Sequence, residues 1–429
     1  MRRRPAVIAR VALFAVVALA VAAVWLAWVN TSGEDPVRPR TAAPPSTDRA
    51  QIARGEYLAR AGNCAGCHTA RGGALYAGGR AIETPFGDIF ASNLTPDAET
   101  GLGTWSADAF WRALHHGRSK DGRLLYPAFP YPNYTRIDRA DADALFAFLQ
   151  TVPPVAQANR THGLGFPFGT QAALAVWRAL YFRPARHVDD PTRPAAWNRG
   201  AYLVEGLGHC NACHSARNAL GATVGPLDLQ GGLIPVQNWY APSLASPHEA
   251  GVAEWPQAEV VRLLKTGISS RGFVMGPMSE VVGRATQFLR DDDLAAIAVY
   301  LQALPAPPEP ARPQAAAPSS ARGAALYRDH CADCHGSGGE GVAGAYPALA
   351  GSRTVTMTSI TNLVRIVLEG GYPPTTEGNP RPFGMPPFTT VLSDADLAEL
   401  LTHLRGAWGH RAGAVSALEV GRARGGNSR

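Results

Sequence analysis

The chain has 429 residues, of which 46% are hydrophobic and 17% charged, and its formal net charge is +6. A chain of this length is expected to form about three domains. The positive charge does not indicate nucleic-acid binding, because no basic run with interleaved aromatic residues occurs beyond the N-terminus. We therefore expect no nucleic-acid partner.

Residues 1–30 are predicted to anchor the chain in a membrane. An uncharged stretch from Val11 to Val29 is long enough to span a bilayer, and it follows four arginines, Arg2, Arg3, Arg4 and Arg10. Arginines on this flank predict a cytoplasmic start, which places the remainder on the periplasmic side of a bacterial inner membrane. A cleaved signal peptide, with a site near Ala18–Ala20, is the alternative, but the apolar run continues well beyond these alanines. Residues 31–48 are expected to form a linker.

All six cysteines lie in three copies of one pattern: Cys64-Ala-Gly-Cys67-His68, Cys210-Asn-Ala-Cys213-His214 and Cys331-Ala-Asp-Cys334-His335. This pattern is the attachment signature of c-type haem. The two thiols bind the haem vinyl groups as thioethers, and the adjacent histidine becomes the proximal iron ligand. Redox-active thiol pairs, disulfides and zinc sites are alternatives for one such motif. Three copies with no cysteine left over favour three covalently bound haem c groups.

The surroundings of the three motifs also repeat, which predicts three tandem modules. Upstream stand Arg54-Gly55-Glu-Tyr57, Arg199-Gly200-Ala-Tyr202 and Arg322-Gly323-Ala-Ala-Leu-Tyr327. Each module ends with a run of apolar residues at helical spacing. Acidic residues stand at the beginning of this run, which predicts the start of a helix. An opening helix packed against a closing helix, with haem between them, predicts an all-α fold of class I cytochrome c modules behind the membrane helix.

The module boundaries follow from these repeats and from the composition between them. The expected modules are residues 49–154, 196–303 and 321–410, separated by a connector at 155–195 and a Pro/Ala-rich linker at 304–320. The connector contains an apolar helix at 172–181 that is too short to span a bilayer. This helix is either a docking element between modules or an ordinary core helix. The tail, residues 411–429, shows no core pattern.

A methionine in the loop before the closing helix is the expected sixth iron ligand, because its soft thioether favours ferrous iron. In the second module Met278 is the favoured ligand and Met275 is its rival. In the third module Met385 is favoured over Met357, which lies further upstream. A Pro or Gly neighbour at each favoured position argues against simple core filling.

The first module has no methionine, and Phe129 stands where the ligand is expected. Three options remain for its iron: five-coordination, a histidine ligand, or a methionine from another module or subunit. His115 and His116 are the local histidine candidates, although two solvated histidines at a helix end are the simpler interpretation. His162 lies beyond the closing helix. The first haem is therefore predicted to differ spectroscopically from the other two.

The chain resembles the membrane-bound triheme cytochrome c subunits that accompany periplasmic dehydrogenases, namely alcohol, gluconate and sorbitol-type enzymes and certain molybdenum hydroxylases. The resemblance covers about residues 50–410, and it rests on the segments 84–103, 125–131, 238–244, 276–282 and 383–388. Alcohol-dehydrogenase members usually read Tyr-Pro-Ala-Met-Pro-Tyr where this chain has Phe129. This departure is similar to members that serve molybdenum hydroxylases.

The resemblance implies a protein that takes electrons from a periplasmic dehydrogenase and passes them along three haems to ubiquinone or a terminal oxidase. It implies no substrate site on this chain. Two other function classes remain open. One is a cytochrome c subunit of a respiratory oxidase, and the other is a catalytic or ligand-binding haem protein that uses an open iron in the first module.

Overall fold

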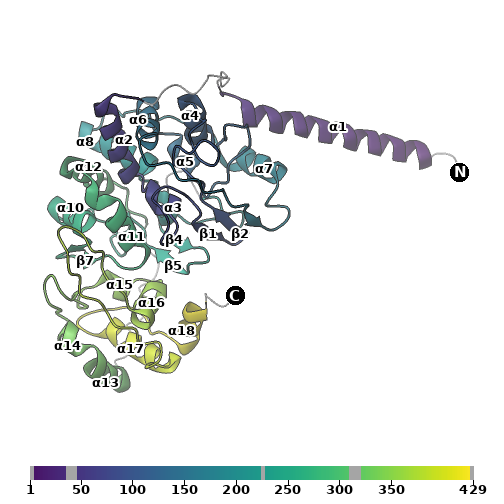
Figure 1. The fold of residues 1–429 in the computed structure, drawn as a ribbon. Helices are drawn as coiled ribbons and strands as arrows, with labels where there is room; N and C mark the ends of the chain where they lie inside the picture. The colour runs from purple at the N-terminus through teal and green to yellow at the C-terminus, as the bar shows by residue number, and fades with distance from the viewer. Residues whose placement is uncertain (1–3, 35–45, 224–227, 309–319, 426–429) are drawn as a thin grey trace.

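The computed structural model describes residues 4–34, 46–223, 228–308 and 320–425. Its first helix, α1 (Arg4–Thr31), projects from the rest of the chain (Figure 1). Residues Val7–Thr31 are long and apolar enough to cross a membrane, and the most apolar window is not buried inside the protein. A signal sequence near the N-terminus would meet the same criteria. The predicted linkers at 31–48 and 304–320 lie largely outside the described residues.

The first unit, residues 46–194, is built around two crossing helices. α2 (Arg49–Ala61) packs against α6 (Arg139–Leu149), and Asp48 caps α2 by accepting hydrogen bonds from two backbone N–H groups of its first turn. Between them lie α3 (Cys64–His68), β1 (Ala81–Thr84), β2 (Gly87–Phe90), α4 (Ala107–His116) and α5 (Tyr131–Tyr134). After α6 come β3 (Gly163–Leu164) and α7 (Gln171–Tyr181). β2 pairs antiparallel with β1, where Ala81 faces Phe90, and with β3.

The second unit, residues 195–308, repeats this plan. α8 (Ala195–Ala201) packs against α12 (Asp291–Gln302) and continues into a π-helical turn, η1 (Tyr202–Leu207). The elements between them are α9 (Asn211–His214), β4 (Gly232–Ile234), β5 (Trp239–Ala241), α10 (Gln257–Thr266), β6 (Ile268–Ser269), β7 (Gly272–Phe273), α11 (Pro277–Arg284) and the 3-10 turn η2 (Thr286–Phe288). β4 pairs with β5, and β6 pairs with β7, both antiparallel.

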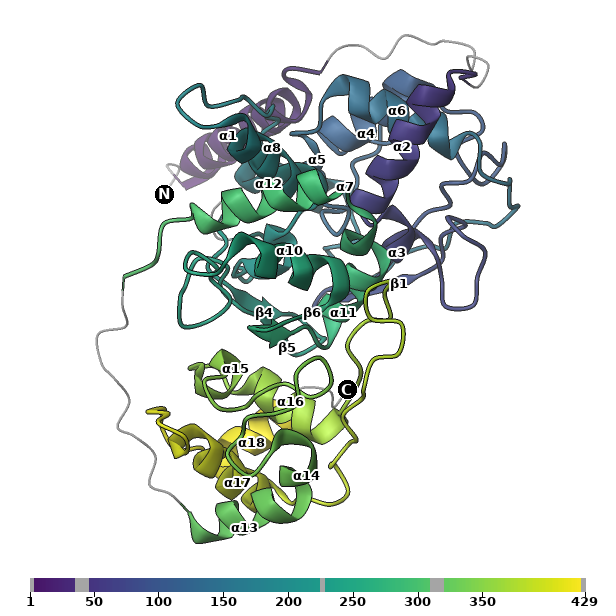
Figure 2. The same ribbon diagram turned by 90° about the vertical axis from the view of Figure 1, so that its left-hand side faces the viewer.

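The third unit, residues 320–425, contains helices only. α13 (Ala321–His330) packs against α17 (Asp394–Gly406), and the other helices are α14 (Ala332–His335), α15 (Arg353–Thr356), α16 (Thr361–Glu369) and α18 (Ala417–Arg424). Figures 1 and 2 show this unit below the first two, which lie side by side, and Asn362 of α16 bonds the backbone of Tyr240 in β5 of the second unit. The predicted pairing of an opening with a closing helix is thus present three times.

The repeated Arg-Gly pair explains how each helix pair crosses so closely. A Cβ atom added at Gly55, Gly200 or Gly323 would collide with a backbone carbonyl oxygen of the facing helix. Those carbonyls belong to Ala144 in α6, Ala296 in α12 and Glu399 in α17. Glycine at this position therefore lets the two helix backbones touch.

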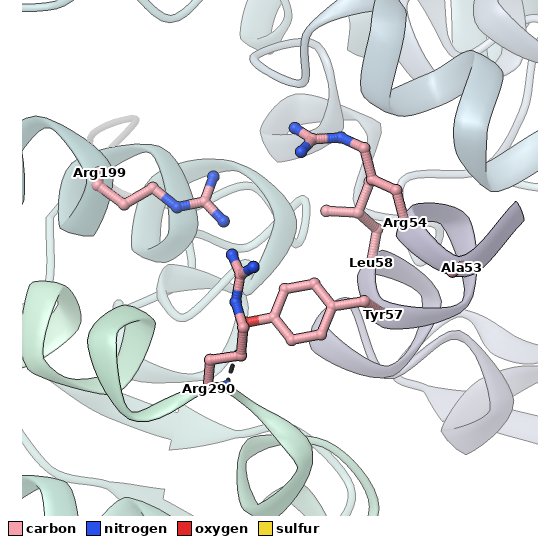
Figure 3. A pocket seen from close by; sticks show the side chains of 6 residues that line it. All are labelled: Ala53, Arg54, Tyr57, Leu58, Arg199 and Arg290. Atoms are coloured by element: carbon pink, nitrogen blue, oxygen red, sulfur yellow. Dashed lines mark hydrogen bonds between the residues drawn. The ribbon is translucent and has the colours of Figure 1, made fainter. Parts of the chain in front are cut away.

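Two tyrosines join the first and second units in a reciprocal way. The hydroxyl of Tyr57 in α2 donates to Asp293 of α12 and accepts the backbone N–H of Arg290 at 3.3 Å (Figure 3). The hydroxyl of Tyr202 in η1 donates to Asp141 of α6 at 2.7 Å and accepts the backbone N–H of Asp138 at 3.2 Å. The same contact is thus made in both directions, as at a two-fold axis between identical subunits.

The third unit does not take part in this exchange. Its opening helix has the matching arginine, Arg322, which pairs with Asp396 as Arg199 pairs with Asp293. Three residues further on, however, stands Ala325 instead of a tyrosine. Buried apolar side chains accordingly form two clusters, one that runs from Leu58 to Leu301 and contains both of the first two units, and one confined to the third unit.

Two expectations from the sequence need correction. The chain is mainly helical, but seven short strands occur in the described part of the first two units. The tail after His410 does contribute to a core, because α18 packs on α16 and α17 and its Val420 is fully buried. The start of α18 carries a capping box, in which Ser416 and Glu419 each bond the backbone of the other.

Candidate haem-binding sites

The three Cys-x-x-Cys-His motifs form the same local structure. Each ends in a single helical turn, α3, α9 or α14, that finishes on the histidine. In the turns of the second and third units, the backbone N–H of the histidine donates to the carbonyl of the first cysteine at 2.9 Å. This turn brings both thiols and the ring to one short stretch of backbone, as covalent haem attachment requires.

No disulfide joins any of the six cysteines, so the disulfide alternative is not realised in this structure. Burial raises the pKa of the Cys64 and Cys210 thiols to about 12 and that of Cys331 to about 11. In a reactive redox pair, by contrast, the pKa of the attacking thiol is lowered. Within the described ranges no three His, Cys, Asp or Glu side chains come together as a metal site would need, so the tetrahedral zinc alternative has no ligand set here.

Each motif histidine is oriented by a backbone carbonyl. Nδ1 lies 2.7 Å from the carbonyl oxygen of Ser92 for His68, 2.7 Å from that of Pro242 for His214 and 2.9 Å from that of Pro347 for His335. A carbonyl only accepts, so Nδ1 carries the proton and Nε2 keeps its lone pair. This is the arrangement of a metal-ligating histidine, whose second nitrogen is held by an outer partner.

The carbonyl partners were not found from the sequence. They lie 24, 28 and 12 residues after their histidines. A signal does exist, since Ser92-Asn93-Leu94, Pro242-Ser243-Leu244 and Pro347-Ala348-Leu349 each place a leucine two residues after the carbonyl. Two of these three segments are among those that carry the family resemblance.

The methionine candidates occupy different surroundings. Met278 is half-buried in the first turn of α11, and Met385 is half-buried against the core of the third unit. The methyl group of Met275, in contrast, reaches Gly371 of the third unit, where an added Cβ would lie 3.5 Å from it. Met357 is buried in the third unit, and its carbonyl accepts a hydrogen bond from Arg405. Met278 and Met385 as the sixth iron ligands stay predictions from the sequence.

Phe129 lies among aromatic residues close to the first attachment turn. Its ring centroid is 5.3 Å from that of Tyr134. Tyr134 is buried, and this burial raises the pKa of its hydroxyl. The nearby Cys64 and Cys67 thiols raise that pKa further. The equivalence of Phe129 to the methionine positions of the other units stays a prediction from the sequence.

The histidines of α4 are not solvated, contrary to the simpler expectation. His115 and His116 are both buried, and the ring of His115 stacks on Trp111 at 4.4 Å. Burial and the neighbouring His116 lower the pKa of His115 to about 4. His162 accepts the backbone N–H of Phe90 through Nδ1 at 3.1 Å. Each ring is thus held by the protein around it.

The first two attachment turns approach each other. Burial is the main cause that raises the pKa of the Cys67 thiol. The charge of Arg80 lowers this pKa, and the charges of Glu280 and of Cys213, both in the second unit, raise it. Arg80 donates to the carbonyl of Gly66 inside the first motif and to Glu280 of α11, with Nη2 3.0 Å from Oε2. Arg80 and Glu280 carry no signal in the sequence, because each has its partner in a different unit.

The geometry of the three turns is that of a cytochrome c, and the comparisons agree. The cytochrome c family profile matches residues 52–153 and 320–408, and this family binds haem c covalently.

The chain is 38% identical to the cytochrome c subunit of the quinone alcohol dehydrogenase of Gluconacetobacter polyoxogenes, over 88% of this chain and 85% of that protein. It is 37% identical to the gluconate 2-dehydrogenase cytochrome c subunit of Pantoea cypripedii, over 86% and 89%. A subunit of the nicotinate dehydrogenase of Pseudomonas putida is 41% identical over 84% of this chain, which spans only 30% of that protein. The chain belongs to the family of dehydrogenase cytochrome c subunits.

Proposed function

We propose that this protein is a triheme c-type cytochrome that carries electrons away from a periplasmic dehydrogenase. The observation that carries the proposal is the threefold repetition of one proximal geometry, in which a backbone carbonyl holds Nδ1 of His68, His214 and His335. A haem iron at each site takes up and releases one electron. The chain's own part is to hold the three groups at fixed separations and to set their potentials through ligands and burial.

Each haem would be held by its own motif. The thioether bonds would form at Cys64 and Cys67, at Cys210 and Cys213, and at Cys331 and Cys334. The proximal ligands would be His68, His214 and His335, and the distal ligands of the second and third haems would be Met278 and Met385. The first haem would have no methionine from its own unit, because Phe129 occupies that position. The three modules would be class I cytochrome c domains with the predicted boundaries.

The close approach of the first two attachment turns supports a relay within this pair. Cys213 affects the ionisation of Cys67, and the Arg80–Glu280 ion pair ties the first turn to the helix that carries Met278. Cys67 and Cys213 would therefore hold two of the haems on either side of the boundary between the units. An electron would pass between these two haems by tunnelling across this boundary.

The partner and acceptor follow from the relatives and from α1. The relatives are subunits of alcohol, gluconate and nicotinate dehydrogenases, which supports a dehydrogenase as donor. Phe129 and the 41% identity to the nicotinate dehydrogenase protein favour a donor of that kind over one that oxidises alcohols. With α1 as an anchor in the inner membrane and the haem units on its periplasmic side, ubiquinone or a terminal oxidase would accept the electrons.

Purification of the intact complex tests the proposal. A tagged chain, extracted in mild detergent, should yield three haems per polypeptide and a co-purifying dehydrogenase whose substrate reduces the haems. A chain with Cys331→Ala and Cys334→Ala should keep two haems and serves as the matched control. Co-purification with a copper–haem oxidase, or peroxide turnover by the isolated chain, would contradict the proposal and support one of the two other function classes.

A further inference from the structure

Helix α7 presents an apolar stripe outside the protein. Its residues Ala172, Val176 and Leu180 follow one another at four-residue spacing, and all three are exposed, Leu180 by 56%. The opposite stripe, Leu174 and Arg178, is buried. A surface helix normally turns a polar face to water. In the part of the chain that the structure describes, the outer face of α7 is instead apolar.

The buried stripe of α7 holds the last turn of α1. Asn30 of α1 donates through Nδ2 to the carbonyl of Ala175 at 3.0 Å and accepts from Nε of Arg178 at 2.9 Å. Arg118 adds a hydrogen bond to the carbonyl of Asn30 and an ion pair to Glu34, with 2.7 and 3.0 Å separations. These groups are well buried, so the end of α1 is fixed on the first unit rather than tethered loosely.

This docking sets the height of α7 relative to a bilayer. The apolar run of α1 ends at Val29, which marks the outer boundary of the hydrocarbon core. Asn30 follows directly and contacts the middle of α7. Figure 1 shows α7 beside the C-terminal end of α1, on the side of the body from which α1 projects. With α1 spanning a bilayer, the exposed stripe of α7 would lie at the level where lipid headgroups meet acyl chains.

The residues on either side of α7 extend the same surface. Phe166 is 91% exposed and Phe168 is 38% exposed in the loop before α7, and Tyr181 is 39% exposed at its end. Aromatic side chains prefer the membrane–water interface. Arg183 and Arg186 follow and are exposed, and guanidinium groups at this height suit lipid phosphates.

We propose that α7 and the loop 165–169 lie in the outer leaflet of the membrane beside α1, so that the bilayer itself covers this apolar face. The proposal rests on the assignment of α1 as a membrane anchor. The first unit then binds the membrane through two helices, the spanning α1 and the interfacial α7. The Asn30 contacts set the depth of α7 in the membrane and thereby the distance of the first attachment turn from the bilayer.

Site-directed spin labelling of the full chain in lipid vesicles tests this position of α7 in the membrane. A nitroxide is attached to a single cysteine at Leu180→Cys, and its accessibility to oxygen, which concentrates in lipid, is compared with that to a water-soluble nickel chelate. The expected result is a preference for oxygen at Leu180. Leu19→Cys in the middle of α1 reports the anchor. Leu418→Cys, 64% exposed on α18, reports an aqueous surface.

The outcomes distinguish a failure of the α7 proposal from a failure of the α1 anchor or of the haem assignment. Preference for the nickel chelate at Leu180, with oxygen preference at Leu19, overturns the interfacial position of α7 and keeps the anchor. Low accessibility to both reagents at Leu180 shows that a protein covers the face and also overturns the proposal. Oxygen exclusion at Leu19 overturns the anchor itself. Label uptake by the unsubstituted chain would show free thiols and contradict the haem assignment, independently of α7.

Discussion

Replacement of Asp293 by Asn is expected to weaken the joint between the first two units. The Asp293 side chain is 5% exposed and accepts hydrogen bonds from Nε and Nη2 of Arg199, at 2.7 and 2.9 Å, and from the hydroxyl of Tyr57. Burial alone would raise its pKa, but the bonds and charges of Arg199, Tyr57 and Arg290 outweigh this and lower the pKa to about 2.

The magnitude follows from linkage between ionisation and folding. The pKa falls from 3.8 to about 2 on folding, which corresponds to about 2 kcal/mol of stability at neutral pH. Because the folded-state pKa is lowered, this stability is fully present above about pH 4. It is lost as the pH falls from about 4 to about 2. The Asp293→Asn variant should therefore be less stable at pH 7 and should approach the parent chain near pH 2.

Urea unfolding of the detergent-solubilised holoprotein, followed by haem absorbance at several pH values, measures this difference. Asp396→Asn is the matched control, because Asp396 pairs with Arg322 at the same place in the third unit but receives no tyrosine. We expect a clearly smaller effect there. Equal stability of Asp293→Asn and the parent chain at pH 7, or a loss that does not shrink toward pH 2, would refute the reasoning.

Three further predictions concern the haem sites. Met278→Leu should lower the potential of one haem and remove its methionine–iron absorption in a redox titration, whereas Met275→Leu should leave both unchanged; the reverse pattern would exchange the two assignments. Phe129→Met should raise the potential of the first haem and make its spectrum resemble the other two, and an unchanged spectrum would show that this loop does not face the iron. Arg80→Gln should cost less than about 1 kcal/mol of stability, because its ion pair is 36% exposed, but should slow electron transfer between the first two haems in rapid-mixing experiments. A normal transfer rate would show that Arg80 does not position the pair.

The sequence predicts well the features that depend on nearby residues. The attachment motifs and the six helices that open and close the units have local signals, namely cysteine spacing, acidic helix starts and apolar periodicity. The closing helices α6 and α12 begin at Arg139 and Asp291, at the acidic runs that predict them. Such patterns need no knowledge of what packs against them.

Features that depend on distant partners were missed. The carbonyls of Ser92 and Pro242 hold their histidines through backbone atoms, which carry no residue-type signal. His115 is buried because Trp111 stacks on it, although its place at a helix end suggests exposure. The few apolar residues of the tail show no core pattern in the sequence, yet Val415, Val420 and Ala423 are buried in the cluster of the third unit.

The shared core of the first two units has a consequence for how the protein melts. Side chains from Leu58 to Leu301 form one continuous apolar cluster, so neither of these units can lose its packing without exposing that of the other. The third unit keeps its own cluster of buried apolar side chains, and its contacts with the second unit include the hydrogen bonds of Asn362 with the backbone of Tyr240. Heating would therefore proceed in two calorimetric steps, and two haem environments would collapse together while the third collapses on its own.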